Sequence, residues 1–207
     1  MRLGLFGGTF DPPHTGHLIV AQDALRTLRL DRVVFVPAAL PPHKRGAPLT
    51  DAMLRLAMVR AALQDDDRFA ADDVELRRAG PSYTVDTLRA YRARFADAKL
   101  FLLIGADQFD EFDTWREAGE IRKLARLGVL AREGVSGSTV DGDGDGGVVR
   151  VAVTRIDISS TDIRRRVAAG EPIRYLVPAA VERIIQEQAL YALPGDAGRP
   201  NRHTAAG

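Results

Sequence analysis

The chain has no cysteine among its 207 residues. It therefore has no disulfide framework, no thiol nucleophile and no cysteine-ligated metal site. It also lacks long hydrophobic runs, because no segment reaches the length of a membrane-spanning helix and the N-terminus has no signal-peptide core. These absences predict a cytoplasmic protein without a membrane partner.

An excess of charge of one sign is missing as well. Lys and Arg number 29, Asp and Glu number 28, and the net charge is +1 with both signs interspersed. A protein that binds bulk nucleic acid presents a strongly basic face, so we expect no such partner. The charge balance does not exclude a local phosphate pocket, because such a pocket needs only a few cations.

The chain does contain short apolar runs that alternate with stretches of helical periodicity. Hydrophobic residues make up 45% of it, enough for a normal core. This alternation predicts an α/β protein, with a Rossmann-like, doubly wound, mostly parallel sheet and a small C-terminal helical part. Residues 1–194 are expected to form a single domain and residues 195–207 a disordered tail.

The individual elements follow from hydrophobic periodicity and from capping residues. The predicted strands are Leu3–Phe6, Val33–Val36, Val74–Leu76, Leu100–Ile104, Leu127–Leu130 and Val148–Val153. The predicted helices are His17–Leu30, Asp51–Leu63 with Thr50 as its N-cap, Val85–Phe95, Ile121–Ala125, Thr161–Ala169 and Pro178–Gln188. In such a sheet, ligands bind beyond the carboxyl ends of the strands, where the strand order reverses.

The segment Val135–Gly147 is rich in aspartate and glycine. From Asp141 onward it imitates a calcium-binding loop, but the twelfth position would be Ala152 instead of glutamate. We therefore interpret the segment as a flexible, hairpin-like connection that a short turn in place of Ser136–Gly147 would replace without loss of activity.

The most informative segment is Gly7-Gly8-Thr9-Phe10-Asp11-Pro12-Pro13-His14-Thr15-Gly16-His17. It joins an apolar strand to an apolar-periodic helix. Glycines let the backbone approach a ligand closely, and a helix start attracts an anion. The segment therefore predicts a phosphate site to which two histidines add side-chain donors. Taken singly, the glycines also fit a plain tight turn and the histidines an exposed loop.

Other common sites do not fit this segment. Its glycine spacing matches neither the dinucleotide fingerprint nor the P-loop. The two histidines lack the spacing and the glutamate of a zinc protease, so we expect no protein metal site.

As a whole, the segment resembles the HxGH signature of the nucleotidyltransferase superfamily. The longer string GGTFDPPHTGH resembles one branch, the bacterial nicotinate-nucleotide adenylyltransferases. The resemblance implies that His14 and His17 are catalytic and act on the triphosphate of ATP, with His17 nearest the reacting centre. It also implies ATP contacts by Gly8, Thr9, Phe10 and Gly16.

Two further segments resemble phosphate-binding elements of that family. Pro41-Pro42-His43-Lys44 resembles a PPHK-like segment, which implies a catalytic Lys44; without the resemblance this residue is a solvated lysine. Ile158–Arg164 resembles an ISSTxIR element, which implies ATP contacts by Ser159, Ser160 and Thr161 and a catalytic Arg164. Ser159 with Asp162 also fits simple helix capping.

Two more segments resemble elements of that family that bind other parts of the substrates. Pro81–Leu88 resembles an SYT-x-DTL segment, which implies that Tyr83 and Thr84 bind the mononucleotide; helix capping by Ser82 or Thr84 is the alternative. Ile104-Gly105-Ala106-Asp107 resembles a G-x-D turn, which implies ATP contacts by Gly105 and Asp107. Trp115 is then implied to stack on a pyridine ring, with core packing as the alternative.

The resemblance implies transfer of the adenylyl group of ATP to nicotinate mononucleotide, giving nicotinate adenine dinucleotide and pyrophosphate in NAD biosynthesis. ATP and the mononucleotide are the expected partners, with Mg²⁺ carried by ATP or pyrophosphate. A homo-oligomer is left open. The alternatives are transfer to nicotinamide mononucleotide or phosphopantetheine, cytidylyl transfer, and a non-catalytic nucleotide sensor. One departure from the family is Ile184, where a tyrosine is common; we expect a change of packing.

Overall fold

The computed structural model describes residues 1–40, 49–132 and 147–192. Within these ranges, one sheet has the strand order β3-β2-β1-β4-β5-β6, and every neighbouring pair is parallel. The strands are β1 (Arg2–Gly8), β2 (Arg32–Pro37), β3 (Phe69–Ala71), β4 (Lys99–Gly105), β5 (Arg126–Arg132) and β6 (Val148–Val153). This is the order of doubly wound, Rossmann-like folds, so the predicted fold class is confirmed. The order reverses between β1 and β4.

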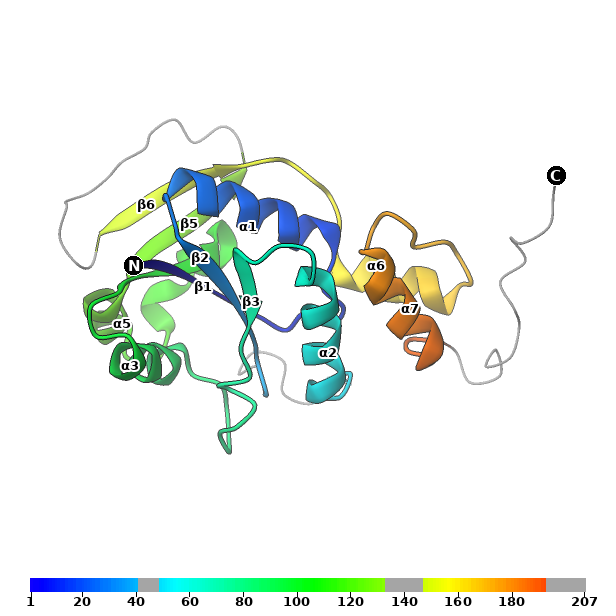
Figure 1. The fold of residues 1–207 in the computed structure, drawn as a ribbon, viewed down its shortest axis with the longest axis horizontal. Helices are drawn as coiled ribbons and strands as arrows, with labels where there is room; N and C mark the ends of the chain where they lie inside the picture. Colours follow the sequence, from blue (N-terminus) through cyan, green and yellow to red (C-terminus); the bar gives the residue numbers. More distant parts are fainter. Residues whose placement is uncertain (41–48, 133–146, 193–207) are drawn as a thin grey trace.

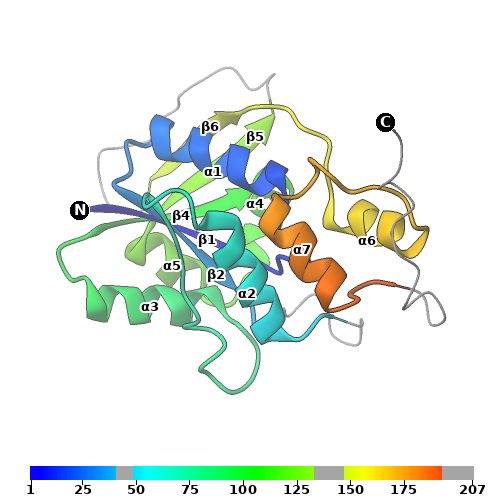
Figure 2. The ribbon, with the colours of Figure 1, turned by 45° about the vertical axis from the view of Figure 1, so that its right-hand side comes forward.

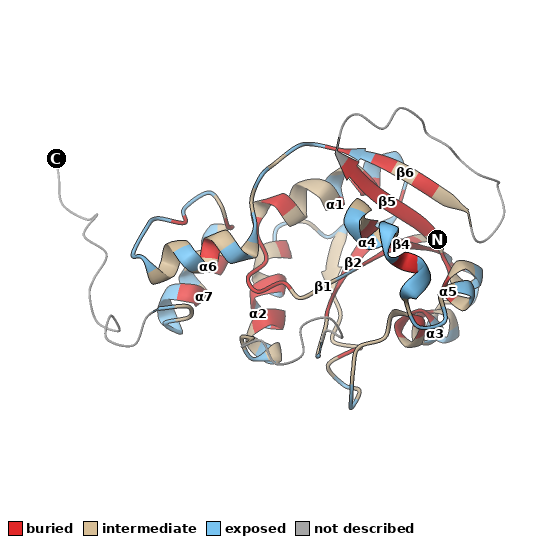
Figure 3. Cartoon of the chain, turned by 180° about the vertical axis from the view of Figure 1, so that it is seen from behind, coloured by how far each residue is buried: buried red, intermediate tan, exposed pale blue. Residues whose placement is uncertain are grey.

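Helices cover both faces of the sheet (Figure 2). They are α1 (Thr15–Thr27), α2 (Ala52–Leu63), α3 (Thr84–Arg94), α4 (Ala106–Asp110), the 3-10 turn η2 (Phe112–Thr114), α5 (Ala118–Leu124), α6 (Ser160–Ala168) and α7 (Ala179–Glu187). One core joins apolar residues of α1 and α2 to the sheet, and a second core joins those of α3 and α5. Because both faces are covered, the central strands are almost continuously apolar and buried (Figure 3).

The small C-terminal helical part is also confirmed. In Figure 1, α6 and α7 lie beyond α2, at one end of the molecule. A third apolar cluster joins Met58 of α2 to Ile163 of α6 and to Val181 of α7, and Ile184 packs against it. The chain before α7 also contacts α1, because the backbone N–H of Thr15 donates to the carbonyl of Leu176 at 2.9 Å. Within the described ranges, no helix combines the length and the hydrophobicity that a membrane span needs.

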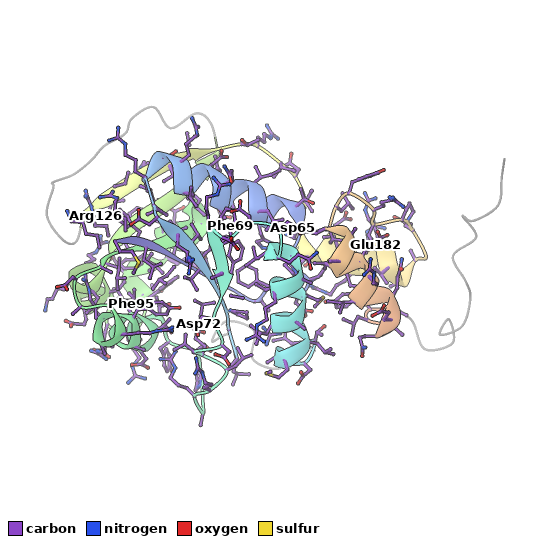
Figure 4. The ribbon with its side chains drawn as sticks, viewed as in Figure 1. Asp65, Phe69, Asp72, Phe95, Arg126 and Glu182 are labelled. Carbon is purple, nitrogen blue, oxygen red and sulfur yellow. The ribbon has the colours of Figure 1, made fainter. Side chains whose placement is uncertain are left out.

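The third predicted strand, Val74–Leu76, is wrong. These residues form turns, and the strand that pairs with β2 is β3, with Phe69 opposite Val33 and Ala71 opposite Phe35. The alternation of apolar Val74 and Leu76 with Glu75 predicted a strand that does not form. The true strand, β3, is only three residues long, too short to show a clear alternation in the sequence. β3 is followed by Asp72, labelled in Figure 4, whose carboxylate accepts a hydrogen bond from the Tyr91 hydroxyl at 2.7 Å.

Two details of the helices also differ from the prediction. The N-cap of α2 is Asp51 and not Thr50, since the Asp51 carboxylate accepts from the backbone N–H groups of Met53 and Leu54 at 2.9 and 3.2 Å. The short elements α4 and η2 were not predicted, because neither is long enough to show an apolar period.

The hairpin-like interpretation of the aspartate- and glycine-rich segment is wrong as well. β5 and β6 are parallel, with Leu127 opposite Val148 and Arg132 opposite Val153. The connection must therefore return from the carboxyl edge of the sheet to the amino edge, along a strand about 20 Å long. Replacing Ser136–Gly147 by two residues leaves five residues between β5 and β6, and these reach about that distance only when fully extended, so we expect the shortening to strain the pairing. Residues 133–146 themselves lie outside the described residues.

Candidate active site

Two cavities open at the carboxyl edge of the sheet, one on each side of the turn after β1. The α1-side cavity, of about 660 Å³, lies between the start of α1, the β4–α4 turn and the ends of β5 and β6. The α3-side cavity, of about 600 Å³, lies between the ends of β1 and β2, the start of α3 and the segment around Trp115. Gly7, Gly8 and Gln108 line both cavities, so the two meet at the point where the strand order reverses.

The end of β1 has no side chains where the two cavities meet, because Gly7 and Gly8 lie there. A Cβ atom on Gly8 would lie 2.8 Å from the ring of Phe10, so a larger residue does not fit there. Phe10 has a φ of 50°, and its ring is buried and packs against Phe6 and Phe35 at centroid distances of 5.7 and 5.5 Å. The Phe10 ring thus forms an apolar part of the cavity wall, and its predicted ATP contact stays a prediction.

The two histidines lie together in the α1-side cavity. Their rings stack with centroids 3.7 Å apart, and the backbone N–H of His14 donates to Nδ1 of His17 at 3.1 Å. His14 is the N-cap of α1 and is only 7% exposed, so the alternative of two exposed loop histidines is wrong. Within the described residues, Nδ1 of His14 is buried without a hydrogen-bond partner.

Burial keeps both imidazoles neutral. It lowers the pKa of His14 from 6.5 to about 4, partly offset by the His14 backbone hydrogen bond. Burial is the main reason why the pKa of His17 lies well below its usual value. The second reason is the electrostatic repulsion that a protonated His14 would exert on a protonated His17. Because Nδ1 of His17 accepts a hydrogen bond, its proton lies on Nε2, which is the donor left for a ligand.

Gly16 lets these rings pack closely. A Cβ atom at this position would lie 3.1 Å from Nδ1 of His14 and 3.4 Å from Ile156. Any side chain here would push against the imidazole and the cavity wall, which explains the glycine between the two histidines.

The segment that carries Ser159, Ser160, Thr161 and Arg164 supports the turn from behind. Ser160 donates to the carbonyl of Pro12 at 2.8 Å, and Arg164 donates to the carbonyl of Asp11 at 2.7 Å and to the hydroxyl of Thr161 at 3.2 Å. Ser159 is the N-cap of α6 and accepts from the N–H of Asp162 at 3.0 Å. The capping interpretation is therefore confirmed for Ser159. These four residues do not line either cavity, so their predicted phosphate contacts stay predictions.

Sequence reasoning missed two buried groups that hold the same turn. The carboxylate of Asp11, 2% exposed, accepts from the Tyr191 hydroxyl at 2.6 Å and from the N–H of Thr50 at 3.3 Å. Burial and the Asp11 contact raise the pKa of Tyr191. Arg55, 1% exposed, donates to backbone carbonyls around the turn, and burial lowers its pKa. No local motif identifies such contacts, because the partners are far apart in the sequence.

The α3-side cavity contains the predicted mononucleotide residues Tyr83, Thr84 and Trp115, together with Thr9. Tyr83 is the N-cap of α3, and its side chain makes no capping hydrogen bond. The alternative interpretation, in which Ser82 or Thr84 caps this helix, is therefore wrong. The guanidinium of Arg116 lies 4.5 Å from the centre of the Tyr83 ring. Trp115 is partly buried and packs against Phe112 at a centroid distance of 5.6 Å, so it both packs and lines the cavity.

One acidic residue in the α3-side cavity was not predicted. Glu75 is 7% exposed, and its carboxylate accepts from the Thr87 hydroxyl at 2.6 Å. Burial raises the pKa of Glu75, against hydrogen bonds from Thr87 and Ser82 and the charge of Arg78. The signal in the sequence is an acidic residue, Glu75, between the two apolar residues of the predicted strand Val74–Leu76.

The remaining predicted residues fall into two groups. Gly105 and Asp107 line the α1-side cavity on the turn between β4 and α4, and Asp107 is exposed. Lys44 lies outside the described residues. The structure thus brings seven predicted residues together around one cavity and five around the other, with Gly8 in both, and the seven are Gly8, Phe10, His14, Gly16, His17, Gly105 and Asp107.

Comparisons with known proteins show the family of this chain. Residues 5–166 match a family model described as cytidylyltransferase-like. Proteins from Shouchella clausii and Thermomicrobium roseum, each named "Probable nicotinate-nucleotide adenylyltransferase", are 45% and 47% identical to the chain. Each alignment covers 92% of this chain, and 96% and 91% of the two relatives. A solved Plasmodium falciparum nicotinic acid mononucleotide adenylyltransferase, complexed with NaAD, has the same fold, with a TM-score of 0.73, 16% identity and coverage of 92% and 97% of the two chains.

Proposed function

This chain belongs to the cytidylyltransferase-like family and, within it, to the nicotinate-nucleotide adenylyltransferases, and from that premise we propose how its residues divide the work. The enzyme transfers the adenylyl group of ATP to nicotinate mononucleotide, giving nicotinate adenine dinucleotide and pyrophosphate in NAD biosynthesis. We propose that ATP binds in the α1-side cavity and the mononucleotide in the α3-side cavity. The observation that carries this proposal is that the two cavities meet at Gly7 and Gly8.

The chemistry of the two linings supports this division. The α1-side cavity offers the neutral donors of His14 and His17, the start of α1 and the carboxylate of Asp107. A helix start with side-chain donors suits a triphosphate, and a carboxylate suits ribose hydroxyls. The α3-side cavity is mostly apolar, with an indole and a helix start, which suits an aromatic ring that carries a carboxylate.

The transfer needs positioning more than acid or base catalysis. An oxygen of the mononucleotide 5′-phosphate attacks the α-phosphorus of ATP, and the bond from that phosphorus to the pyrophosphate breaks. A phosphate monoester has a second pKa of about 6, so the attacking group is already anionic near neutral pH. We propose that Nε2–H of His17 donates to the α-phosphate, where charge develops, and that His14 holds the adjacent phosphates.

The supporting residues fit the same scheme. Backbone groups of Gly8 and Thr9 approach the phosphates at the meeting point of the cavities. Arg164 uses part of its guanidinium on the turn, but its five N–H donors leave others for the pyrophosphate. The roles of Arg164, Ser159, Ser160 and Thr161 toward phosphate are proposals, and so is that of Lys44.

Magnesium fits this site as an ion carried on the phosphates. Among the residues with described positions, no group of three or more His, Asp or Glu side chains gathers to hold a metal. The ATP phosphates would hold the ion together with water molecules, in the manner usual for Mg²⁺, which keeps several waters. When bound, it neutralises charge on the leaving pyrophosphate.

We assign the discrimination between nicotinate mononucleotide and nicotinamide mononucleotide to the first turn of α3. The backbone N–H groups of Thr84 and Val85 lie there, where helix geometry gives them no partner within the helix, and the helix dipole adds positive potential. A nicotinate carboxylate accepts from such donors, whereas the amide of nicotinamide presents its own N–H₂. Glu75 in the same cavity would repel the carboxylate if it were charged, and burial raises its pKa.

Parallel kinetics on the two mononucleotides test this assignment. We expect the enzyme to prefer nicotinate mononucleotide over nicotinamide mononucleotide by roughly 10²-fold or more in kcat/KM. A ratio of the two kcat/KM values near one, or a preference for the amide, would contradict the assignment of the mononucleotide to the α3-side cavity. Pyrophosphate release with ATP and the acid also separates an enzyme from a nucleotide sensor.

Two expectations of wider scope stay proposals. They are a single domain over residues 1–194 and action in the cytoplasm, which limited proteolysis and cell fractionation, respectively, test. Sedimentation velocity tests whether the protein assembles into a homo-oligomer, which the sequence leaves open.

A further inference from the structure

Arg55 lies in the first turn of α2, and its side chain is 1% exposed. Its guanidinium donates only to backbone carbonyls in the described structure. Nε donates to Thr50 at 2.9 Å, one terminal nitrogen donates to Thr9 and Ala38 at 2.8 Å each, and the other donates to Ala39 at 3.3 Å. One buried cation therefore joins the turn after β1, the chain after β2 and the residue before the cap of α2.

The segments that Arg55 joins belong to both substrate cavities. Thr9 and Ala38 line the α3-side cavity, and Thr9 directly follows Gly8, which lines both. The backbone N–H of Ala38 also donates to the carbonyl of Gly8 at 2.9 Å. The two turns that face the junction of the cavities are thus held to one another and to Arg55.

The same connection reaches the start of α3. The N–H of Ala39 donates to the hydroxyl of Ser82 at 2.9 Å, and the N–H of Ser82 donates to the carbonyl of Leu40 at 3.2 Å. Ser82 precedes Tyr83 and Thr84, the residues assigned to the mononucleotide. A continuous series of hydrogen bonds therefore runs from the turn assigned to the phosphates, through Arg55 and Ala39, to the segment assigned to the acceptor.

We propose that Arg55 is a positioning residue for adenylyl transfer, which fixes the distance and angle between the two substrates. It does not line either cavity, so it acts through Thr9, Ala38 and Ala39 and not by contact. A buried charge is costly, and an apolar residue of similar volume would pack a helix at least as well. A purely structural role in α2 accounts for the hydrogen bond to Thr50, but it would not direct the other three, to Thr9, Ala38 and Ala39, toward the catalytic edge. The proposal rests on the assignment of the two cavities given above.

The test compares Arg55→Lys with Arg92→Lys, which is its matched control. Arg92, on α3, also donates to backbone carbonyls, those of Leu124 and Ala98, at 2.8 Å each, but away from both cavities. Steady-state kinetics are measured at a temperature where circular dichroism shows every variant folded. We expect kcat of Arg55→Lys to fall about 10²-fold, because a small misplacement of two reactants has that effect. For Arg92→Lys we expect a lower Tm with kcat within about twofold of the wild type.

A kcat for Arg55→Lys within about threefold of the wild type would overturn the proposal. Chemical rescue gives a second readout: millimolar guanidinium should restore kcat of Arg55→Ala at least about tenfold, and should leave Arg92→Ala unchanged. If Arg55→Lys does not fold, Arg55→Gln is measured in its place, since its side-chain amide keeps a donor in the buried site without the charge. A fall in kcat of about tenfold or more supports the proposal, and a kcat within about threefold of the wild type contradicts it. Wild-type transfer to nicotinate mononucleotide in the same assay separates this proposal from the proposed function.

Discussion

The turn after β1 and the turn after β4 lie side by side at the same edge of the sheet, but they are built in opposite ways. In the β1 turn, Asp11 and His14 are buried, and side chains from α2, α6 and the end of the described chain bond to it. In the β4 turn, Asp107 and Gln108 are exposed. The side chain of Gln108 accepts a hydrogen bond from the N–H of Gly105 at 3.3 Å, within the turn itself.

This difference separates two tasks of one site. Stabilising charge at a reacting phosphorus needs groups that are already fixed before the reaction, because reorganisation costs free energy at the transition state. Holding a ribose or a hydrated ion needs only a carboxylate that exchanges readily with water. We therefore expect changes in the β1 turn to alter catalysis and stability, and changes around the β4 turn to alter ligand affinity alone.

The largest effect is expected for His17→Ala. Loss of one fixed donor at the reacting centre should lower kcat by roughly 10²–10³-fold. His17 also packs on Phe10 at a centroid distance of 5.1 Å and accepts from the N–H of His14, so the alanine variant should melt earlier as well. Steady-state kinetics and thermal melts measure the two effects.

His17→Asn is the matched variant, because its side-chain oxygen can replace Nδ1 as the acceptor while nothing replaces Nε2. We expect it to recover part of the Tm and none of the kcat. Near-normal turnover of either variant would remove His17 from the catalytic residues, and the contrast between the two turns would lose its main support.

The second effect is a pH dependence of stability that comes from His14. Its folded pKa, about 4, lies below its unfolded value of 6.5. The unfolded chain therefore binds a proton that the folded chain does not, and stability falls as the pH drops from about 6.5 to about 4. The loss should reach roughly 3 kcal/mol and is fully absent above the unfolded pKa.

Urea unfolding at about pH 7.5 and about pH 4.5 measures this loss. His14→Gln lacks the titrating group, so its stability should fall less over the same range, which isolates His14 from His17 and from the carboxyl groups. An equal fall in the two proteins would show that His14 is not buried as a neutral base.

The contrast also explains what the sequence could predict. Hydrophobic periodicity identified five of the six described strands, and the contiguous string Gly7–His17 identified the phosphate side, because in both cases the signal is local. The supports of the β1 turn come from far away: Ser160 is 148 residues from Pro12, and Tyr191 is 180 residues from Asp11. Arg55 looks in the sequence like any exposed helical arginine, since only the fold shows where its side chain is directed.

Trp115, which follows the β4 turn through η2, is expected to affect affinity. Trp115→Ala should weaken binding of the mononucleotide by about 1–3 kcal/mol, by analogy with base stacking, and should leave ATP binding unchanged. Isothermal titration with each ligand separately measures this. Trp115→Phe keeps an aromatic face and should recover most of the affinity. Equal weakening of both ligands together with a lower Tm would favour core packing against Phe112 as the main role.

The smallest effect is expected for Asp107→Asn, and it sharpens the comparison most. The two side chains have the same shape, so the variant keeps an oxygen that accepts a hydrogen bond and loses only the charge. Hydrogen bonds to charged groups are worth about 1 kcal/mol more than neutral ones, so ATP should bind about fivefold more weakly. Because Asp107 is exposed and no ion pair within the described residues involves it, the Tm should stay unchanged. The kcat at saturating ATP should also stay within about twofold of the wild type, since the β1 turn carries the chemistry.

Titration calorimetry, a thermal melt and kinetics on one preparation measure the ATP affinity, the Tm and the kcat of Asp107→Asn. A large fall in kcat at saturating ATP would mean that the open turn takes part in the reaction, and the division of tasks between the two turns would then be wrong.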